Sequence, residues 1–123
     1  MADGGGRIPR ILIVEYEPAI AVDLQDLILD AGFASAGMVE RLDAALAVIE
    51  SGGCDAAILD ANLAGVSAAP AAAALVAGGL PFLVMSGYSA RQLEAAFPDA
   101  VILQKPFRPD RLIRMLREIL GAG

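Results

Sequence analysis

Short apolar runs alternate along the chain with segments in which apolar residues recur at helical spacing. Runs without charged side chains predict five strands, at 11–14, 33–39, 56–59, 81–85 and 100–103. Segments with apolar residues three or four positions apart predict helices at 18–31, 42–49, 68–77, 90–97 and 109–120. Pro18 stands where a first helical turn tolerates proline, and Gly32 stands where that helix ends. The pattern is therefore strand followed by helix, five times over.

This alternation predicts an α/β protein with a five-stranded parallel sheet between two helical layers, the doubly wound (βα)5 sandwich of flavodoxin-like folds. Ligands in such folds bind beyond the carboxyl ends of the strands. We therefore expect the polar residues that follow the strands to meet at one rim. They are Glu15, Tyr16 and Glu17, then Asp60 and Asn62, then Ser86 and Tyr88, then Lys105.

The length of 123 residues, 57% of them hydrophobic, suits one domain with a core of its own. We assign residues 1–9 to a flexible lead and 10–121 to that domain, and expect no output domain. Residues 61–90 lack charged side chains, but prolines and glycines divide them into pieces too short to cross a bilayer. The start of the chain has no apolar signal-peptide core. We expect a cytoplasmic protein.

Charge and residue usage exclude several functions. The chain has no histidine and one cysteine, which excludes histidine-based triads, histidine-ligated zinc sites and an internal disulfide framework. A net charge of −6 weighs against nucleic-acid binding. Residues 1–60 hold 11 acids and 3 bases, whereas the remainder holds 4 acids and 6 bases. Arginines 108, 111 and 114 lie largely outside the apolar arc of the last helix, which indicates either a solvated face or a docking surface.

The predicted rim has the chemistry of phosphoryl transfer. A carboxylate can attack phosphorus and form an acyl phosphate if the charge on the phosphoryl oxygens is neutralised. Asp60 follows the central apolar run and is the natural nucleophile, while Lys105, the hydroxyl of Ser86 and a divalent cation would supply the neutralisation. Taken alone, each of these residues is equally typical of a turn or a solvated position.

Several segments together carry a resemblance to a known family. Residues 13–18 (IVEYEP), 58–63 (ILDANL) and 105–107 (KPF), together with Ser86, resemble the motifs of response-regulator receiver domains, in the family's order. The resemblance covers about residues 10–120. Residues 81–88 also resemble, in part, a segment of certain single-domain receivers.

The resemblance implies a stand-alone receiver that signals by protein contact and is not an enzyme. Asp60 would accept a phosphoryl group from a histidine kinase or a phosphotransfer protein. Glu15, Asp60 and the backbone carbonyl of Asn62 would hold Mg²⁺, Lys105 would assist, and Ser86 and Tyr88 would act as switch residues. Partner contacts in this family commonly involve the fourth and fifth helices, which makes the face with Arg108, Arg111 and Arg114 the candidate partner-binding surface.

One departure from the family pattern concerns the metal. Tyr16 stands where receivers carry a second acidic residue, and a neutral phenol is a poor ligand for a hard cation. We therefore expect weakened Mg²⁺ binding. The alternative function is a degenerate receiver that binds partners without phosphorylation.

Two further functions fit the rim less well. An aspartate-nucleophile phosphatase needs a second acid where Asn62 stands. A flavin- or nucleotide-binding protein needs a loop that cradles phosphate, and the loop after the first strand is acidic instead.

The predicted third helix, 68–77, is apolar all round. Part of it must face outwards, which indicates a contact surface and a homodimer as one candidate assembly.

Overall fold

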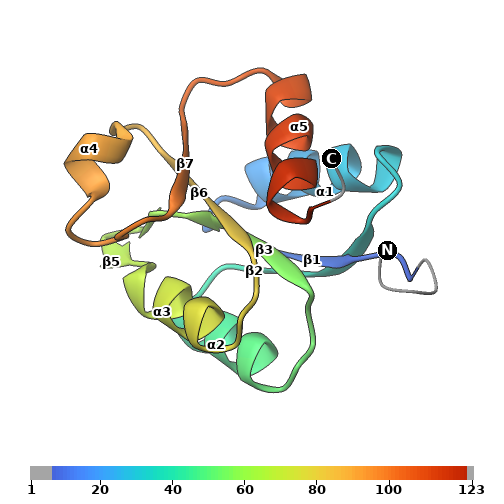
Figure 1. Cartoon of the computed structure of the whole chain (residues 1–123), viewed down its shortest axis with the longest axis horizontal. Coiled ribbons are helices and arrows are strands. Elements are labelled where there is room, and N and C mark those ends of the chain that lie inside the picture. Colours follow the sequence, from blue (N-terminus) through green and yellow to red (C-terminus); the bar gives the residue numbers. More distant parts are fainter. Residues whose placement is uncertain (1–6, 122–123) are drawn as a thin grey trace.

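The computed structural model describes residues 7–121, and its elements follow the predicted order (Figure 1). Five parallel strands form the main sheet: β1 (Arg10–Val14), β2 (Ala34–Val39), β3 (Ala56–Asp60), β6 (Phe82–Ser86) and β7 (Val101–Gln104). The helices are α1 (Pro18–Asp30), α2 (Leu42–Glu50), α3 (Ala69–Ala77), α4 (Ala90–Leu93) and α5 (Pro109–Ile119). The strand order is β2-β1-β3-β6-β7, with β3 in the centre. The predicted flavodoxin-like fold is confirmed.

Alternate residues of each buried strand point to opposite faces, and each face has its own core. Ile11, Ile13 and Ile58 pack with residues of α1 and α5, whereas Leu12 and Leu59 pack with residues of α2 and α3. The strands are apolar on both faces because helices cover both, as Figure 1 shows. This packing fixes the strand ends, and hence the rim, in place.

The fourth helix is shorter than predicted. It ends at Leu93 rather than at Phe97, and residues 94–99 form turns. The residue before a proline disfavours helical conformation, and Pro98 follows Phe97 directly. Phe97 is instead buried in the core cluster formed by residues of α2, α3 and the sheet. Asp99 then takes a positive φ of 59°, which turns the chain into β7.

A small hairpin after β3 was not predicted. β4 (Asn62–Leu63) pairs antiparallel with β5 (Val66–Ser67). Ala64 and Gly65 make the turn, both with positive φ. The side chain of Asn62 stabilises it, because its Oδ1 accepts a hydrogen bond from the Gly65 N–H at 2.6 Å. Residue 62 is thereby held directly after the strand that ends in Asp60.

Three further observations concern the start of the chain, the hydropathy of the helices and the single cysteine. Most of the predicted lead, residues 1–6, lies outside the described residues, and Arg7 forms an ion pair with Asp55 at 2.7 Å. No helix within residues 7–121 combines the length and apolar character needed to cross a bilayer. Cys54, the single cysteine, is buried, and burial raises the pKa of its thiol.

Candidate functional site

Asp60 stands at the carboxyl end of the central strand, with its side chain 13% exposed. Its Oδ2 accepts a hydrogen bond from the ammonium Nζ of Lys105 at 3.2 Å, across 45 positions of sequence. Its Oδ1 accepts one from the backbone N–H of Asn62, also at 3.2 Å. The structure therefore brings the predicted nucleophile and the predicted lysine together.

Glu15 follows β1 and is 1% exposed. Its Oε2 accepts a hydrogen bond from the backbone N–H of Glu17 at 3.0 Å, whereas the buried Oε1 has no partner among the described residues. Burial raises the pKa of Glu15, and the neighbouring carboxyl of Asp60 raises it further, while Lys105 acts in the opposite direction. A buried carboxylate oxygen without a partner is costly unless a donor or a cation meets it.

The residues at this rim fit a divalent cation only in part. The unpartnered Oε1 of Glu15, a carboxylate oxygen of Asp60 and the carbonyl of Asn62 are oxygen donors of the kind that Mg²⁺ takes. Tyr16 is 50% exposed and lines a separate hollow of about 450 Å³ beside the start of α2 and the β4–β5 hairpin. Within residues 7–121, no cluster of three or more acidic, histidine or cysteine side chains suits a metal ion. The site thus offers two carboxylates.

The predicted switch residues lie one strand further along. Ser86 is buried at the end of β6, where its Oγ accepts a hydrogen bond from the backbone N–H of Tyr88 at 2.9 Å. The carbonyl of Ser86 accepts one from the N–H of Lys105 at 2.7 Å, and the Lys105–Pro106 peptide is cis. The backbone of Ser86 is therefore tied to the residue that contacts Asp60. The side chain of Tyr88 is 62% exposed, and no hydrogen bond of the described residues joins it to Asp60.

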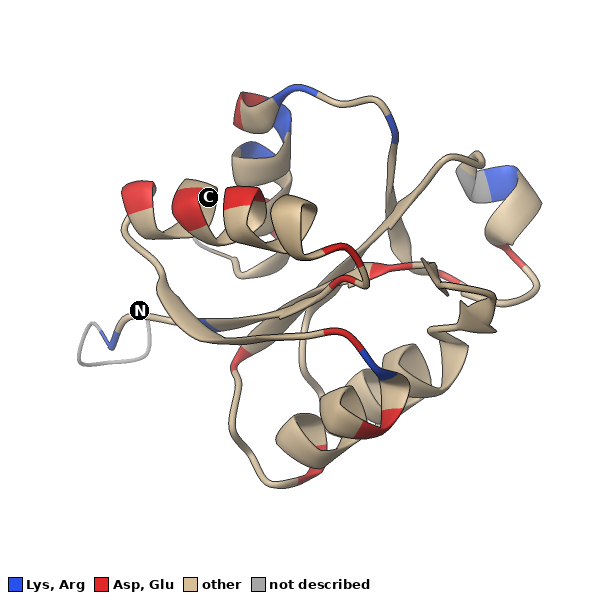
Figure 2. Cartoon of the chain, turned by 180° about the vertical axis from the view of Figure 1, so that it is seen from behind, with Lys and Arg blue, Asp and Glu red and all other residues tan. Residues whose placement is uncertain are grey.

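Arg108, the residue before α5, and Arg111 and Arg114 of α5 are exposed. Arg108 pairs with Asp110 at 3.2 Å, and Arg114 approaches the same carboxylate at 3.8 Å. Arg111 forms no ion pair with any residue between 7 and 121. Figure 2 shows basic residues on α5 and the loop before it, and acidic residues along α1. These exposed pairs contribute little to stability, so their value lies in the charge they present.

Comparison with known proteins addresses the family. No protein-family model matches the chain, and no curated protein sequence matches it. Among solved structures, SdrG from Sphingomonas melonis Fr1 is 41% identical with a TM-score of 0.78, over 92% of this chain and 97% of that chain. A response regulator receiver protein from Sinorhizobium medicae WSM419 is 25% identical with a TM-score of 0.83, over 94% and 97% respectively.

A longer response regulator is similar as well. PhyR from Brucella abortus is 27% identical with a TM-score of 0.81, and the match covers 94% of this chain but 49% of PhyR. The fold, the order of motifs and these similarities agree. The chain belongs to the response-regulator receiver family.

Proposed function

We propose that this receiver accepts a phosphoryl group on Asp60 from a histidine kinase or a phosphotransfer protein. A carboxylate oxygen of Asp60 attacks phosphorus, the bond from phosphorus to the donor's nitrogen breaks, and the donor leaves with the electron pair of that bond. The product is an acyl phosphate. The observation that carries the proposal is the environment of Asp60, which has one lysine and one backbone N–H as donors beside the unpartnered oxygen of buried Glu15.

Charge neutralisation supports the same assignment. Lys105 already contacts Asp60 and would donate to a phosphoryl oxygen. Ser86, buried at the end of the adjacent strand, would donate its hydroxyl to another. Glu15, Asp60 and the Asn62 carbonyl would hold Mg²⁺, which when bound neutralises charge on the transferring group. The missing second acid at Tyr16 predicts that this binding is weak.

The output of such a reaction would be a change in protein contacts. Phosphorylation adds negative charge and new acceptor oxygens beside Lys105 and Ser86. The carbonyl of Ser86 accepts a hydrogen bond from the N–H of Lys105, and its Oγ accepts one from the N–H of Tyr88, so a shift at Asp60 has a short path to the exposed Tyr88. The face with Arg108, Arg111 and Arg114 is the surface we assign to a downstream partner.

The second candidate function is a receiver that binds partners without phosphorylation. The observation that favours it is Tyr16, half-exposed in a separate hollow and unsuited to hold a cation. In this case the Asp60–Lys105 ion pair would persist and would hold the partner-binding surface in one conformation. Partner affinity would then be the same for the wild type and Asp60→Asn.

The experiment that separates the two functions is intact-mass analysis after incubation with acetyl phosphate, with and without Mg²⁺. The proposal predicts a gain of one phosphoryl group in the wild type that requires Mg²⁺ and is absent in Asp60→Asn. A wild type that gains nothing, together with a Tyr16→Asp variant that does, would establish the second function.

A further inference from the structure

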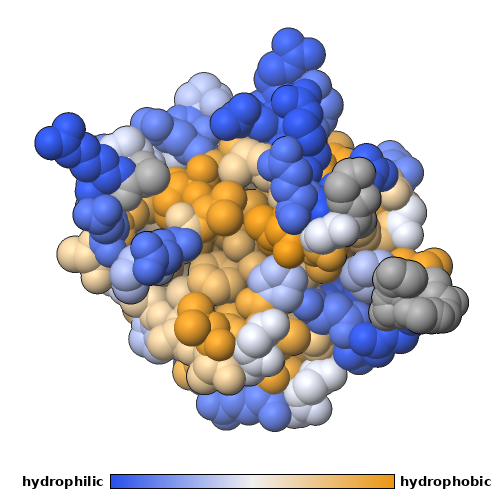
Figure 3. All heavy atoms as spheres, in the orientation of Figure 1, coloured by the Kyte–Doolittle hydropathy of each residue, from blue (hydrophilic) through white to orange (hydrophobic). Residues whose placement is uncertain are grey.

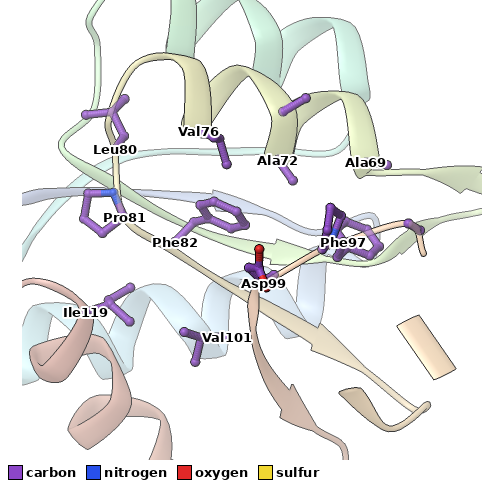
Figure 4. A pocket seen from close by; sticks show the side chains of 14 residues that line it. Ala69, Ala72, Val76, Leu80, Pro81, Phe82, Phe97, Asp99, Val101 and Ile119 are labelled. Atoms are coloured by element: carbon purple, nitrogen blue, oxygen red, sulfur yellow. The ribbon is translucent and has the colours of Figure 1, made fainter. Parts of the chain in front are cut away.

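An apolar groove lies between α3 and the segment that leads from α4 to β7 (Figure 4). It has a volume of about 690 Å³, and thirteen of its fourteen lining residues are apolar, with Asp99 as the exception. Phe82 and Val101 line it and are the first residues of β6 and β7, whereas Asp60 is the last residue of β3. Because these strands are parallel, the groove and the phosphorylation site lie at opposite ends of the strands.

Apolar side chains on both walls of the groove are open to solvent. Val76 of α3 is 65% exposed, and Val101 of β7 is 39% exposed. Phe82 lies half-buried between these two walls (Figure 4). Figure 3 shows an apolar area between polar borders on the side that carries the groove. Contiguous exposed apolar surface of this kind marks a place where a ligand or a partner binds.

Asp99 gives the groove its single charge. Within residues 7–121 it is one of two residues other than glycine with a positive φ, and the other, Ala64, makes the turn of the β4–β5 hairpin. This backbone conformation sets the direction in which the side chain leaves the chain. Figure 4 shows the carboxyl group of Asp99 directed toward the space between Phe82 and Phe97. No side chain among residues 7–121 forms an ion pair with it.

This charge decides which ligands fit the groove. The carboxylate of Asp99 is exposed, so water solvates it while the groove is open. A neutral apolar ligand would displace that water and leave the carboxylate without a partner, which is costly. An anionic ligand would be repelled by Asp99 and by the net charge of −6. A ligand with a cationic nitrogen would instead replace the water with a charge-assisted hydrogen bond.

We propose that the groove binds a small organic amine, whose apolar body lies against Val76 and Phe82 and whose ammonium group pairs with Asp99. The volume favours a small molecule, because it falls within the range of roughly 300–1,000 Å³ that is typical of such sites. The site is separate from Asp60 and shares no residue with the phosphorylation site. Amine binding and phosphoryl transfer can therefore each fail without the other.

Two probes of the same shape test the proposal, phenylbutylamine and its neutral analogue phenylbutanol. Each is titrated into the whole chain at neutral pH, where the amine is protonated, and binding is followed by the amide chemical shifts in NMR spectra. We expect a dissociation constant of about 1 mM or lower for the amine, and one at least about tenfold higher for the alcohol. The amide shifts should be confined to residues around the groove.

Variants separate the contribution of charge from that of apolar contact. Asp99→Asn keeps the side-chain size and a residue type that tolerates positive φ, and it should weaken the amine about tenfold while leaving the alcohol unchanged. The matched control is Glu94→Gln, which removes the same charge from an exposed residue of the same segment outside the groove and should change neither affinity. Val76→Ser removes part of an apolar wall and should weaken both probes alike, about threefold.

Several outcomes would overturn the proposal. They are equal affinities of the wild type for amine and alcohol, equal effects of Asp99→Asn and Glu94→Gln on the amine, and no binding of either probe below about 10 mM. A lysine between apolar residues of a protein offers the same chemistry as the amine. A capped peptide with one lysine between leucines is therefore titrated as well, and tighter binding of this peptide than of the amine would assign the groove to a protein partner instead. Circular dichroism of each variant checks the fold.

Discussion

Two aspartates flank the same central strand, and their surroundings differ. Asp55 directly precedes β3 and Asp60 ends it. The carboxylate of Asp55 accepts four hydrogen bonds, from Arg7, from the backbone N–H of Arg10 and twice from the guanidinium of Arg10. These donors hold the pKa of Asp55 below its usual range, with the Arg10 side-chain hydrogen bond as the main cause. Asp55 is a structural tie between β1 and β3.

Asp60 has fewer donors and an acidic neighbour. It accepts one hydrogen bond from Lys105 and one from a backbone N–H, and buried Glu15 lies beside it. Its oxygens therefore keep free lone pairs in a place where a cation or a phosphoryl group would be stabilised. A carboxylate whose lone pairs are all hydrogen-bonded stabilises the fold, whereas a carboxylate with free lone pairs beside a second acid is available for chemistry.

The largest effect is expected on labelling by acetyl phosphate when each of these two aspartates is replaced by asparagine. Asp60→Asn should abolish labelling by acetyl phosphate completely, because an amide oxygen is too weak a nucleophile. Asp55→Asn should be labelled as the wild type is, at a temperature where it stays folded. Phos-tag electrophoresis of both variants measures this. Labelling of Asp60→Asn at the wild-type level would contradict the contrast.

The free energy of unfolding should depend on Asp55, which labelling does not require. Asp55→Asn should lower the free energy of unfolding by about 2 kcal/mol at neutral pH, since it removes charge-assisted hydrogen bonds. The folded-state pKa of Asp55 is lowered, so its stabilisation is complete above the ordinary value of 3.8 and is lost as pH falls below it. Urea titrations at several pH values should show the two proteins converging in acid. A difference independent of pH would argue against the ion pairs.

A substitution at Tyr16 tests how this residue affects the affinity of the site for Mg²⁺. Tyr16→Asp should increase the affinity for Mg²⁺ about tenfold, or about 1.4 kcal/mol, because it adds an anionic oxygen next to Glu15. Tyr88→Asp, at an exposed position beyond a different strand, is the matched control and should change the affinity far less. Isothermal titration calorimetry gives both values. Equal affinities for wild type and Tyr16→Asp would remove Tyr16 from the account of the site.

The smallest effect is expected at Glu15. Glu15→Gln should raise the free energy of unfolding by about 1 kcal/mol at neutral pH, because it removes a buried charge with an unpartnered oxygen. The folded-state pKa of Glu15 is raised, so its ionised form costs stability only as pH rises above the ordinary value of 4.5. The gain should therefore vanish below that pH. Thermal unfolding at both ends of this range tests the sign.

Most of the fold and the rim could be predicted because they depend on local patterns. Apolar runs located the five strands, and the parallel sheet then places the residues after them at one edge. The ties of Asp55 could not be predicted, since Arg10 is 45 positions away and neither residue is unusual in its own segment. The predicted end of α4 is wrong because the helical spacing continues to Phe97, whereas Phe97 precedes a proline and is buried beside α3 instead.

The most direct measurement is to locate the phosphoryl group by chemistry. Borohydride reduces an aspartyl phosphate to homoserine, which peptide mass spectrometry identifies by position. After acetyl phosphate and Mg²⁺, the account predicts homoserine at position 60 and unmodified aspartate at position 55. Homoserine at any other position, or none in a Tyr16→Asp protein that binds Mg²⁺, would contradict the assignment of Asp60 as the phospho-acceptor.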